Sequence, residues 1–218
     1  MLDSFSIGEE ADRASYLHDS CVRLARMLGR DGLDEALTLL GALLAERGQR
    51  VGLLIVGGGN LLLLGVIDRP TADVDVLGLA SPSGYVKASA LPGFLTAAVR
   101  DVAHALGLNE SWLNAGPTDL MDLGLPPGLA GRVSVRDYGG VQIHLVGPED
   151  LIFFKLYAAV DQGERSKHFV DLRTLEPTPR QLVDAARWTR THDPSPGFLG
   201  ELQRILALLG VRVSDGDV

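Results

Sequence analysis

The feature that most constrains the fold is an apolar run, Val51–Val56, that stops at three consecutive glycines, Gly57–Gly59. A short apolar run bounded by glycine is typical of a buried strand, and glycine lets the backbone turn sharply or approach a ligand closely. A further apolar run, Leu61–Gly65, follows Asn60 and predicts a short helix. The sequence therefore predicts a strand, a glycine turn and a short helix in direct succession.

A second strand is expected over Asp73–Leu77, where Asp73 and Asp75 alternate with Val74 and Val76. Successive side chains of a strand point to opposite faces, so the two aspartates project together while the valines point into the core. Like charges this close raise one another's pKa, which is costly unless a cation or a cluster of donors lies between them. A divalent metal is the simplest remedy, and Mg²⁺ takes carboxylate oxygens while keeping phosphate and water as its other ligands.

Other glycine-rich motifs fit this stretch less well. A P-loop requires a lysine after its last glycine, and no lysine follows Gly65. A dinucleotide fingerprint requires a third glycine where Leu62 stands, and the segment between Gly59 and Asp68 is too short for a full crossover helix. One alternative stays open, in which the glycines serve packing and the aspartates end a solvated strand.

Composition bounds the class of protein. The chain has 218 residues, of which 46% are hydrophobic, so we expect a globular fold of one large domain or of a domain with an appended one. No run reaches the roughly 18 apolar residues of a membrane span, and the first residues lack a signal-peptide layout, so we expect a cytoplasmic protein without a membrane partner. The single Cys21 excludes an intramolecular disulfide and a cysteine metal cluster.

The formal net charge of −8 argues against a broad nucleic-acid surface, although it does not exclude RNA at a local patch. The same acidity would suit a cationic small substrate or a basic protein partner.

Periodicity predicts helices on both sides of this central region and one hairpin within it. The hairpin strands are Arg132–Val135 and Val141–Leu145, which alternate at period two around Gly139 and Gly140. Ser81–Gly84 is expected to be a loop and Asn109–Pro127 irregular. The predicted helices are Glu9–Leu28, Leu33–Glu46, Leu95–Leu106, one opening at Pro148, one following Arg165–Arg173, one from the capping box Thr178–Gln181 to about Thr191, and Leu199–Leu209.

These elements predict a mixed α/β fold in three parts. We expect an N-terminal helical segment over residues 1–48, a core over residues 49–147 and a C-terminal helical region over residues 148–218. Lys155 lies in a largely apolar stretch of the helix that opens at Pro148. Its side chain either snorkels to solvent, which position alone favours, or directs its ammonium at a phosphate.

Together these motifs resemble the nucleotidyltransferase signature of the DNA polymerase β superfamily, in which an apolar residue and a glycine pair precede Asp-apolar-Asp. Within that superfamily the chain is similar to the bacterial group that includes AbiEii-type and MenT-type toxins of toxin–antitoxin systems. The resemblance runs from about Val51 to Leu175. Its parts are Gly57-Gly58, then Arg69-x-Thr71-x-Asp73-Val74-Asp75, then Glu149-Asp150-Leu151 leading to Lys155-Leu156-x-Ala158, and finally Asp171-Leu172.

The resemblance implies a nucleotidyltransferase fold with a mixed sheet flanked by helices, and it implies site residues. Asp73 and Asp75 would bind Mg²⁺ and act in catalysis, Lys155 would contact phosphate, and Asp171 would have a catalytic or supporting role. Nucleotide-binding roles fall to Lys155 and to the residues around the turn, Gly57, Gly58, Arg69 and Thr71. Backbone N–H groups after the two glycines would cradle phosphate oxygens. For Arg69, a solvent-exposed loop arginine is the open alternative.

The implied activity is Mg²⁺-dependent transfer of a nucleotidyl group from a nucleoside triphosphate to an acceptor hydroxyl, with tRNA as a candidate acceptor and an antitoxin as a candidate partner. An aminoglycoside-type small acceptor is one alternative, and a non-catalytic protein of the same fold is another. Two departures from the family motivate the last. His168 replaces the first acid of the pattern Lys-Asp-x-x-Asp, and no acid occupies the second hairpin strand, where relatives often carry a third carboxylate.

Overall fold

The computed structural model describes residues 27–122 and 124–218, which form a six-stranded mixed sheet flanked by helices. The strand order is β3-β2-β1-β6-β5, and β4 pairs with β2 beside β3. Within the described residues, no helix is long and apolar enough to cross a membrane. The strands are β1 (Val51–Val56), β2 (Val74–Ser81), β3 (Gly84–Lys87), β4 (Leu113–Asn114), β5 (Ser134–Asp137) and β6 (Val141–Leu145).

The central strand β1 lies between β2, which runs antiparallel to it, and β6, which runs parallel to it. Its four last residues, Leu53–Val56, are buried, which explains why the run is continuously apolar there. The register places Val56, the last residue of β1, opposite Asp75 near the start of β2. On its other side, β2 pairs in parallel with β4, so that Asp75 lies beside Asn114.

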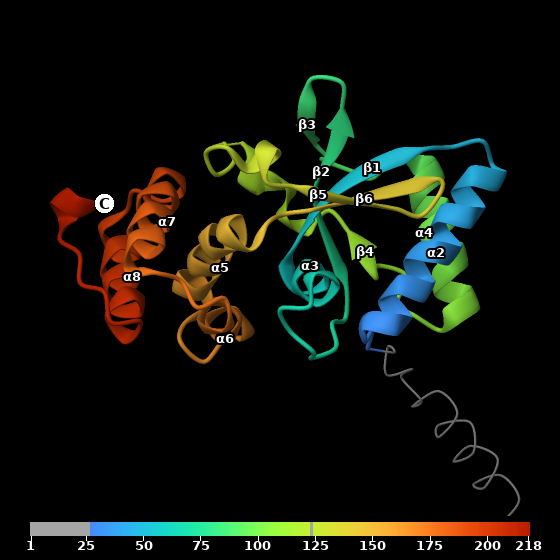
Figure 1. The fold of residues 1–218 in the computed structure, drawn as a ribbon. Helices are drawn as coiled ribbons and strands as arrows, with labels where there is room; N and C mark the ends of the chain where they lie inside the picture. The colour runs from blue at the N-terminus through green and yellow to red at the C-terminus, as the bar shows by residue number, and fades with distance from the viewer. Residues whose placement is uncertain (1–26, 123) are drawn as a thin grey trace, which may run out of the picture.

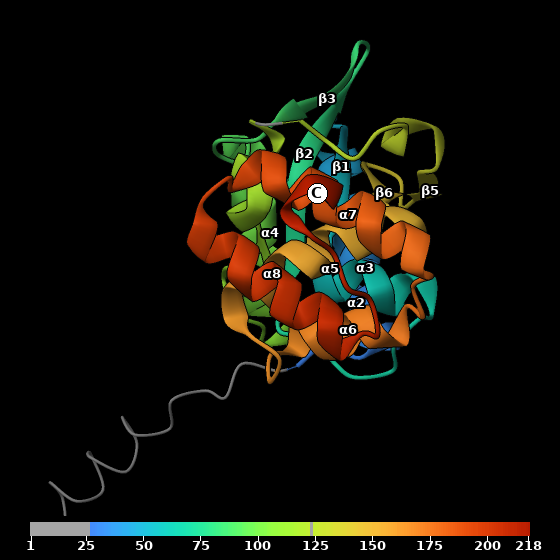
Figure 2. The same cartoon turned by 90° about the vertical axis from the view of Figure 1, so that its left-hand side faces the viewer.

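The helices form two groups (Figure 1). α2 and α4 lie side by side at one end of the molecule, and α5–α8 gather at the other, with the sheet between them. Figure 2 views the molecule from the side of α5–α8. The helices are α2 (Arg30–Glu46), α3 (Gly57–Leu64), α4 (Gly93–Leu106), α5 (Pro148–Gln162), α6 (Lys167–Thr174), α7 (Pro179–His192) and α8 (Pro196–Leu208), with short 3-10 segments at Gly116–Met121, Leu129–Gly131 and Asp215–Asp217.

Two clusters of buried apolar side chains hold the fold together. The larger one joins the sheet to α2, α3 and α4, and the smaller one joins α5, α6, α7 and α8. Helix α5 belongs to both, since Leu151 and Phe154 lie in the larger cluster whereas Leu156 and Ala159 lie in the smaller one.

The predicted fold class is confirmed, and so are most of the expected elements. β1 and β6 have the predicted bounds, and the capping box at Thr178 is formed, with Gln181 bonded reciprocally. α2, α4 and α8 each begin two or three residues before the predicted start. The helix expected over Glu9–Leu28 lies outside the described residues, except that Leu28 forms an isolated bridge with Thr71.

Four expectations about strands need correction. β2 begins one residue after Asp73 and continues to Ser81, because it pairs with β3, a strand that was not predicted. β5 covers Ser134–Asp137, two residues later than expected. The stretch predicted to be irregular contains β4, whose two residues pair with β2 and whose Leu113 is buried in the core. Such non-local pairing leaves no periodic signal in so short a segment.

Helix α2 packs on the hairpin turn through two glycines. A Cβ atom at Gly41 would collide with the backbone carbonyl of Tyr138, and a Cβ at Gly140 would lie 2.5 Å from the amide nitrogen of Ala45. This approach lets the amide of Gly140 donate a hydrogen bond of 3.0 Å to the carbonyl of Gly41. Helix and hairpin are therefore in direct backbone contact.

We expect Gly41→Ala to lower the free energy of unfolding by about 1 to 3 kcal/mol, because backbone atoms must move to admit the methyl group. Gly32→Ala in the same helix is the matched control. Its Cβ would meet only Leu28 at 3.8 Å, so the substitution should be neutral or stabilise the helix by up to about 1 kcal/mol. Urea unfolding of the two variants measures the difference, and equal midpoints would contradict the packing argument.

Candidate active site

The glycine turn after β1 is shaped around the carboxylate of Asp75. Gly57 has φ +79°, and a Cβ atom there would collide with Oδ2 of Asp75, so both conformation and space require glycine. Gly57 opens α3, which has no side-chain hydrogen bond at its N-cap, Val56. The first backbone N–H groups of α3 therefore stand beside the acid without a capping partner, which is an arrangement that suits a phosphate oxygen.

The two aspartates lie as the alternation of β2 predicted. Val74 and Val76 are fully buried in the core, whereas Asp73 and Asp75 are half-buried on the other face. Burial and the neighbouring charge of Asp73 raise the pKa of Asp75, and Lys167, Lys155 and Asn114 oppose that shift without cancelling it. The predicted repulsion between the two carboxylates is thus present.

Asp171 gathers two cations opposite this pair. Nε and Nη2 of Arg69 donate to Oδ1 at 3.2 and 2.7 Å, and Nη2 also donates to Oδ2 at 2.6 Å. Nζ of Lys155 donates to Oδ2 at 2.6 Å. Burial alone would raise the pKa of Asp171, but Arg69 and Lys155 outweigh it and lower that pKa. Asp171 is therefore an anion that positions two cations.

The burial of Lys155 corrects the expectation that its side chain snorkels to solvent. The residue is 2% exposed, and burial lowers the pKa of its ammonium although Asp171 and Asp75 favour the charged form. A buried ammonium requires a counter-charge, and Asp171 on α6 supplies it. Arg69 is also held by this ion pair, so it is not a free loop arginine.

Thr71 connects the loop before β2 to the glycine turn. Its Oγ1 donates to the carbonyl of Asp73 at 3.1 Å. Its backbone N–H donates to the carbonyl of Leu28, and its carbonyl accepts from the N–H of Leu28. A Cβ atom at Gly58 would lie 3.0 Å from Oγ1 of Thr71 and 3.8 Å from Nη1 of Arg69. The structure therefore brings the predicted residues Gly57, Gly58, Arg69, Thr71 and Asp73 together at the start of α3.

His168 lies on α6, three residues before Asp171 and thus on the same helix face. It is half-buried, and burial together with the charges of Lys155 and Lys167 lowers its pKa to about 4. The imidazole is consequently neutral at pH 7.

Two residues that act on Asp75 and one buried residue of α3 were not predicted. Asn114 reaches Asp75 from β4, and Lys167 acts on Asp75 from the start of α6. Asn60 is fully buried, and its Nδ2 donates to the carbonyl of Val146 at 2.8 Å, which fixes α3 to the end of β6. Lys167 stands in a charged segment that the sequence marks, whereas Asn114 and Asn60 depend on non-local pairing.

The donor set fits a hard cation such as Mg²⁺. Asp73 and Asp75 provide carboxylate oxygens on one face, and the uncapped start of α3 lies next to them. Among the residues that the structure describes, no three His, Cys, Asp or Glu side chains gather as a metal-binding group. An ion held by this pair would therefore need further ligands from phosphate and water. His144, on the second hairpin strand, is not one of them, since a Cβ atom at Gly52 near the start of β1 would lie 3.0 Å from its Nε2, whereas Asp75 pairs with Val56 at the end of β1.

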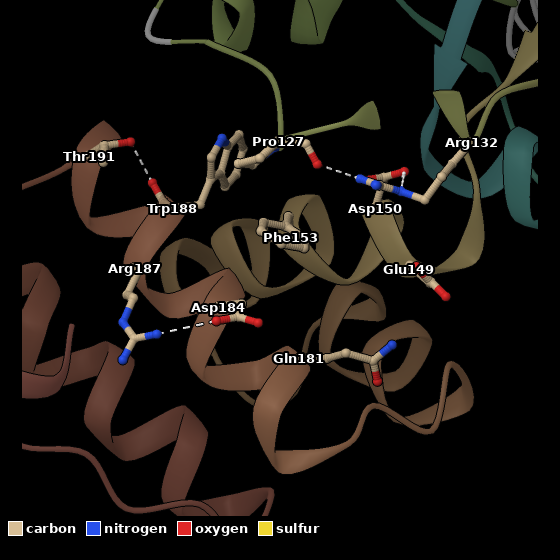
Figure 3. Close-up of a pocket in the computed structure, with 10 residues that line it drawn as sticks. All are labelled: Pro127, Arg132, Glu149, Asp150, Phe153, Gln181, Asp184, Arg187, Trp188 and Thr191. Carbon is tan, nitrogen blue, oxygen red and sulfur yellow. Dashed lines mark hydrogen bonds and ion pairs between the residues drawn. The ribbon is translucent and has the colours of Figure 1, made fainter. Parts of the chain in front are cut away.

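A pocket of about 540 Å³ lies between α5, α7 and the loop before β5 (Figure 3). Phe153 and Trp188 form its apolar wall, and Arg132, which lines it, donates from Nε to the buried Asp150 at 3.0 Å. None of the predicted site residues lines it. Phe153 and Lys155 are two positions apart on α5 and so point to different sides of the helix, which separates this pocket from the acid pair.

Comparison with known proteins supports a nucleotidyltransferase, as the geometry of the site does. Residues 33–166 match the family model described as "Nucleotidyltransferase of unknown function (DUF6036)". The match contains Asp73, Asp75 and Lys155 and ends before His168 and Asp171. Neither the search of curated proteins nor that of solved structures gave a match. Because the matched segment covers more than half of the chain, the protein belongs to the DUF6036 family of nucleotidyltransferases.

Proposed function

We propose that this protein transfers a nucleotidyl group from a nucleoside triphosphate to an acceptor hydroxyl, using Mg²⁺ held by Asp73 and Asp75. The observation that carries the proposal is the half-buried acid pair beside the uncapped start of α3, where Arg69, held by Asp171, also lies. We further propose tRNA as the acceptor and an antitoxin as partner, on the resemblance to AbiEii-type and MenT-type toxins.

Each group has a defined part in this chemistry. The N–H groups at the start of α3 would bind phosphate oxygens, and Lys155 and Arg69 would neutralise the charge of the triphosphate. Asp171 acts as a positioning residue, since it holds both cations and is itself 1% exposed. Mg²⁺, when bound, would polarise the α-phosphate and lower the pKa of the acceptor hydroxyl. Positioning and electrostatics would then supply most of the rate enhancement.

The direct test is label transfer. The full chain is incubated with Mg²⁺, total tRNA and each of the four nucleoside triphosphates labelled at the α-phosphate. We expect labelled RNA with at least one nucleotide. No labelling with any of the four, on tRNA or on a panel of aminoglycosides, would contradict the enzymatic proposal.

A small cationic acceptor is the second candidate, and the net charge of −8 favours it. The aminoglycoside panel in the same assay separates the two acceptors. Labelled aminoglycoside with unlabelled RNA would replace tRNA in the proposal and leave the enzyme class unchanged.

Asp73→Asn and Asp75→Asn should each lower the rate of label transfer by at least about 100-fold, since even the loss of an outer-shell partner costs 10- to 100-fold in a metal site. An Asp137→Asn variant, altered at an exposed aspartate on β5, serves as the control and should retain the parental rate. A rate near the parental value in either site variant would remove the acid pair from the mechanism.

The same pair predicts an opposite effect on stability. The raised pKa of Asp75 means that its ionised form destabilises the folded state once the pH exceeds the ordinary value of 3.8, and fully above the raised pKa. Asp75→Asn should therefore raise the melting temperature of the metal-free protein at pH 7, and the gain should vanish as the pH falls below 3.8.

Asp137→Asn is again the control, because hydrogen bonds from Gln142 and Gly139 lower the pKa of Asp137. Its melting temperature at pH 7 should be unchanged or lower. Calorimetric scans across pH measure both variants, and a lowered melting temperature for Asp75→Asn would show that the acid pair is not strained.

Gly57→Ala should lower label transfer by about 100-fold, which is the cost of misplacing a reacting group by about 1 Å. The new methyl group would displace the Asp75 carboxylate, and alanine also disfavours the positive φ. Gly93→Ala is the matched control, because Gly93 likewise opens a helix and has open space at its Cβ. Equal rates for the two variants would refute the role of the turn.

A further inference from the structure

The third acid of the site, Asp171, has no oxygen left for a metal ion. A carboxylate has about four lone-pair sites. Here Oδ1 accepts from Nε and Nη2 of Arg69, and Oδ2 accepts from Nη2 of Arg69 and from Nζ of Lys155. The residue is also 1% exposed. The four acceptor sites of the Asp171 carboxylate are therefore taken up by Arg69 and Lys155.

The position next to Asp171 does not supply a replacement ligand. His168 shares the helix face of Asp171. Burial disfavours positive charge on its ring most, and Lys155, Lys167 and Arg69 act in the same direction although Asp171 opposes them. The charges that repel a proton from this imidazole would repel a divalent ion more strongly, because the Coulomb energy scales with the charge. This side of the site thus offers a second metal ion a fully bonded carboxylate and three nearby cations.

Across from these cations stand only Asp73 and Asp75. Within residues 27–122 and 124–218, no third His, Cys, Asp or Glu side chain joins them in a metal-binding group. Sites with two metal ions hold them about 4 Å apart, where they stabilise both the attacking and the leaving oxygen. The described side chains provide for one such ion and not for its neighbour.

We propose that the site binds a single divalent ion per chain, and that Lys155 and Arg69 supply positive charge that a second one would otherwise bring. This inference rests on the proposed function and specifies its metal requirement. The Lys155 ammonium acts as a point charge and the Arg69 guanidinium as a planar fork of donors, and both suit phosphate oxygens. Asp171 is the positioning residue that holds them there.

Manganese stoichiometry tests this inference without reference to activity. Mn²⁺ is titrated into the full chain with the α,β-methylene analogue of each nucleoside triphosphate, and the free ion is counted by electron paramagnetic resonance. Two Mn²⁺ ions about 4 Å apart give a coupled spectrum, whereas an isolated ion gives six separate lines. In the protein fraction, separated from free analogue by filtration, we expect one uncoupled ion per chain, and its loss in Asp75→Asn.

Residue 168 allows a matched pair of variants. His168→Asp adds a carboxylate beside the cations and should admit a second, coupled Mn²⁺. His168→Asn has the same size without the charge and should stay at one ion. Asp171→Asn should also keep one ion, since Asp171 is not a ligand. A single ion in His168→Asp would overturn the charge argument.

Two results separate this inference from the proposed function. A coupled pair of ions in the unaltered chain would overturn the single-ion inference, and label transfer to tRNA in the same preparation would leave the proposed function standing. Mn²⁺ binding that does not depend on Asp75, combined with no label transfer to any acceptor, would overturn both.

Discussion

The site depends on the repulsion between the carboxylates of Asp73 and Asp75, which the sheet holds close together. In a flexible loop, two neighbouring carboxylates would turn apart into water. Here β2 is paired on both sides at Asp75, with Val56 on one edge and Asn114 on the other, and the carboxylate lies against Gly57. The backbone therefore fixes the acids together, and only a counter-charge can relieve the repulsion.

The second half of the site resolves a similar conflict internally. A buried ammonium and a buried carboxylate are each expensive to remove from water, and the pair is stable only if the remaining hydrogen bonds are also made. Asp171 meets this condition because Arg69 completes its carboxylate beside the bond from Lys155. The repulsion between Asp73 and Asp75 is thus left for a ligand to relieve, whereas the buried charges of Lys155 and Asp171 are neutralised by the protein's own side chains.

Motifs formed by residues close together in the sequence were predicted correctly. The glycine turn, the alternation of Asp73 and Asp75 with valine, and the capping box at Thr178 all involve residues a few positions apart, and the structure contains them. The resemblance to nucleotidyltransferases agrees with the family match, although the match does not reach the finer toxin group.

What the sequence did not predict is set by partners far along the chain. On position alone the Lys155 side chain was expected to snorkel to solvent. Its counter-ion Asp171 comes from another helix, and Arg69, which bonds the same carboxylate, comes from a loop. Asn114 was missed for the same reason, since two residues form β4 only because β2 is beside them. Pairing between distant segments, rather than propensity, decided these positions.

Helix α5 has a double membership whose consequence extends beyond packing. Leu151 and Phe154 fasten it to the sheet, Leu156 and Ala159 fasten it to the C-terminal helices, and Lys155 lies between these two sets. The position of the Lys155 ammonium therefore depends on the packing of α5 against the sheet as well as against the C-terminal helices. Competence of this centre is in that sense a property of the entire described chain rather than of the strands that carry the aspartates.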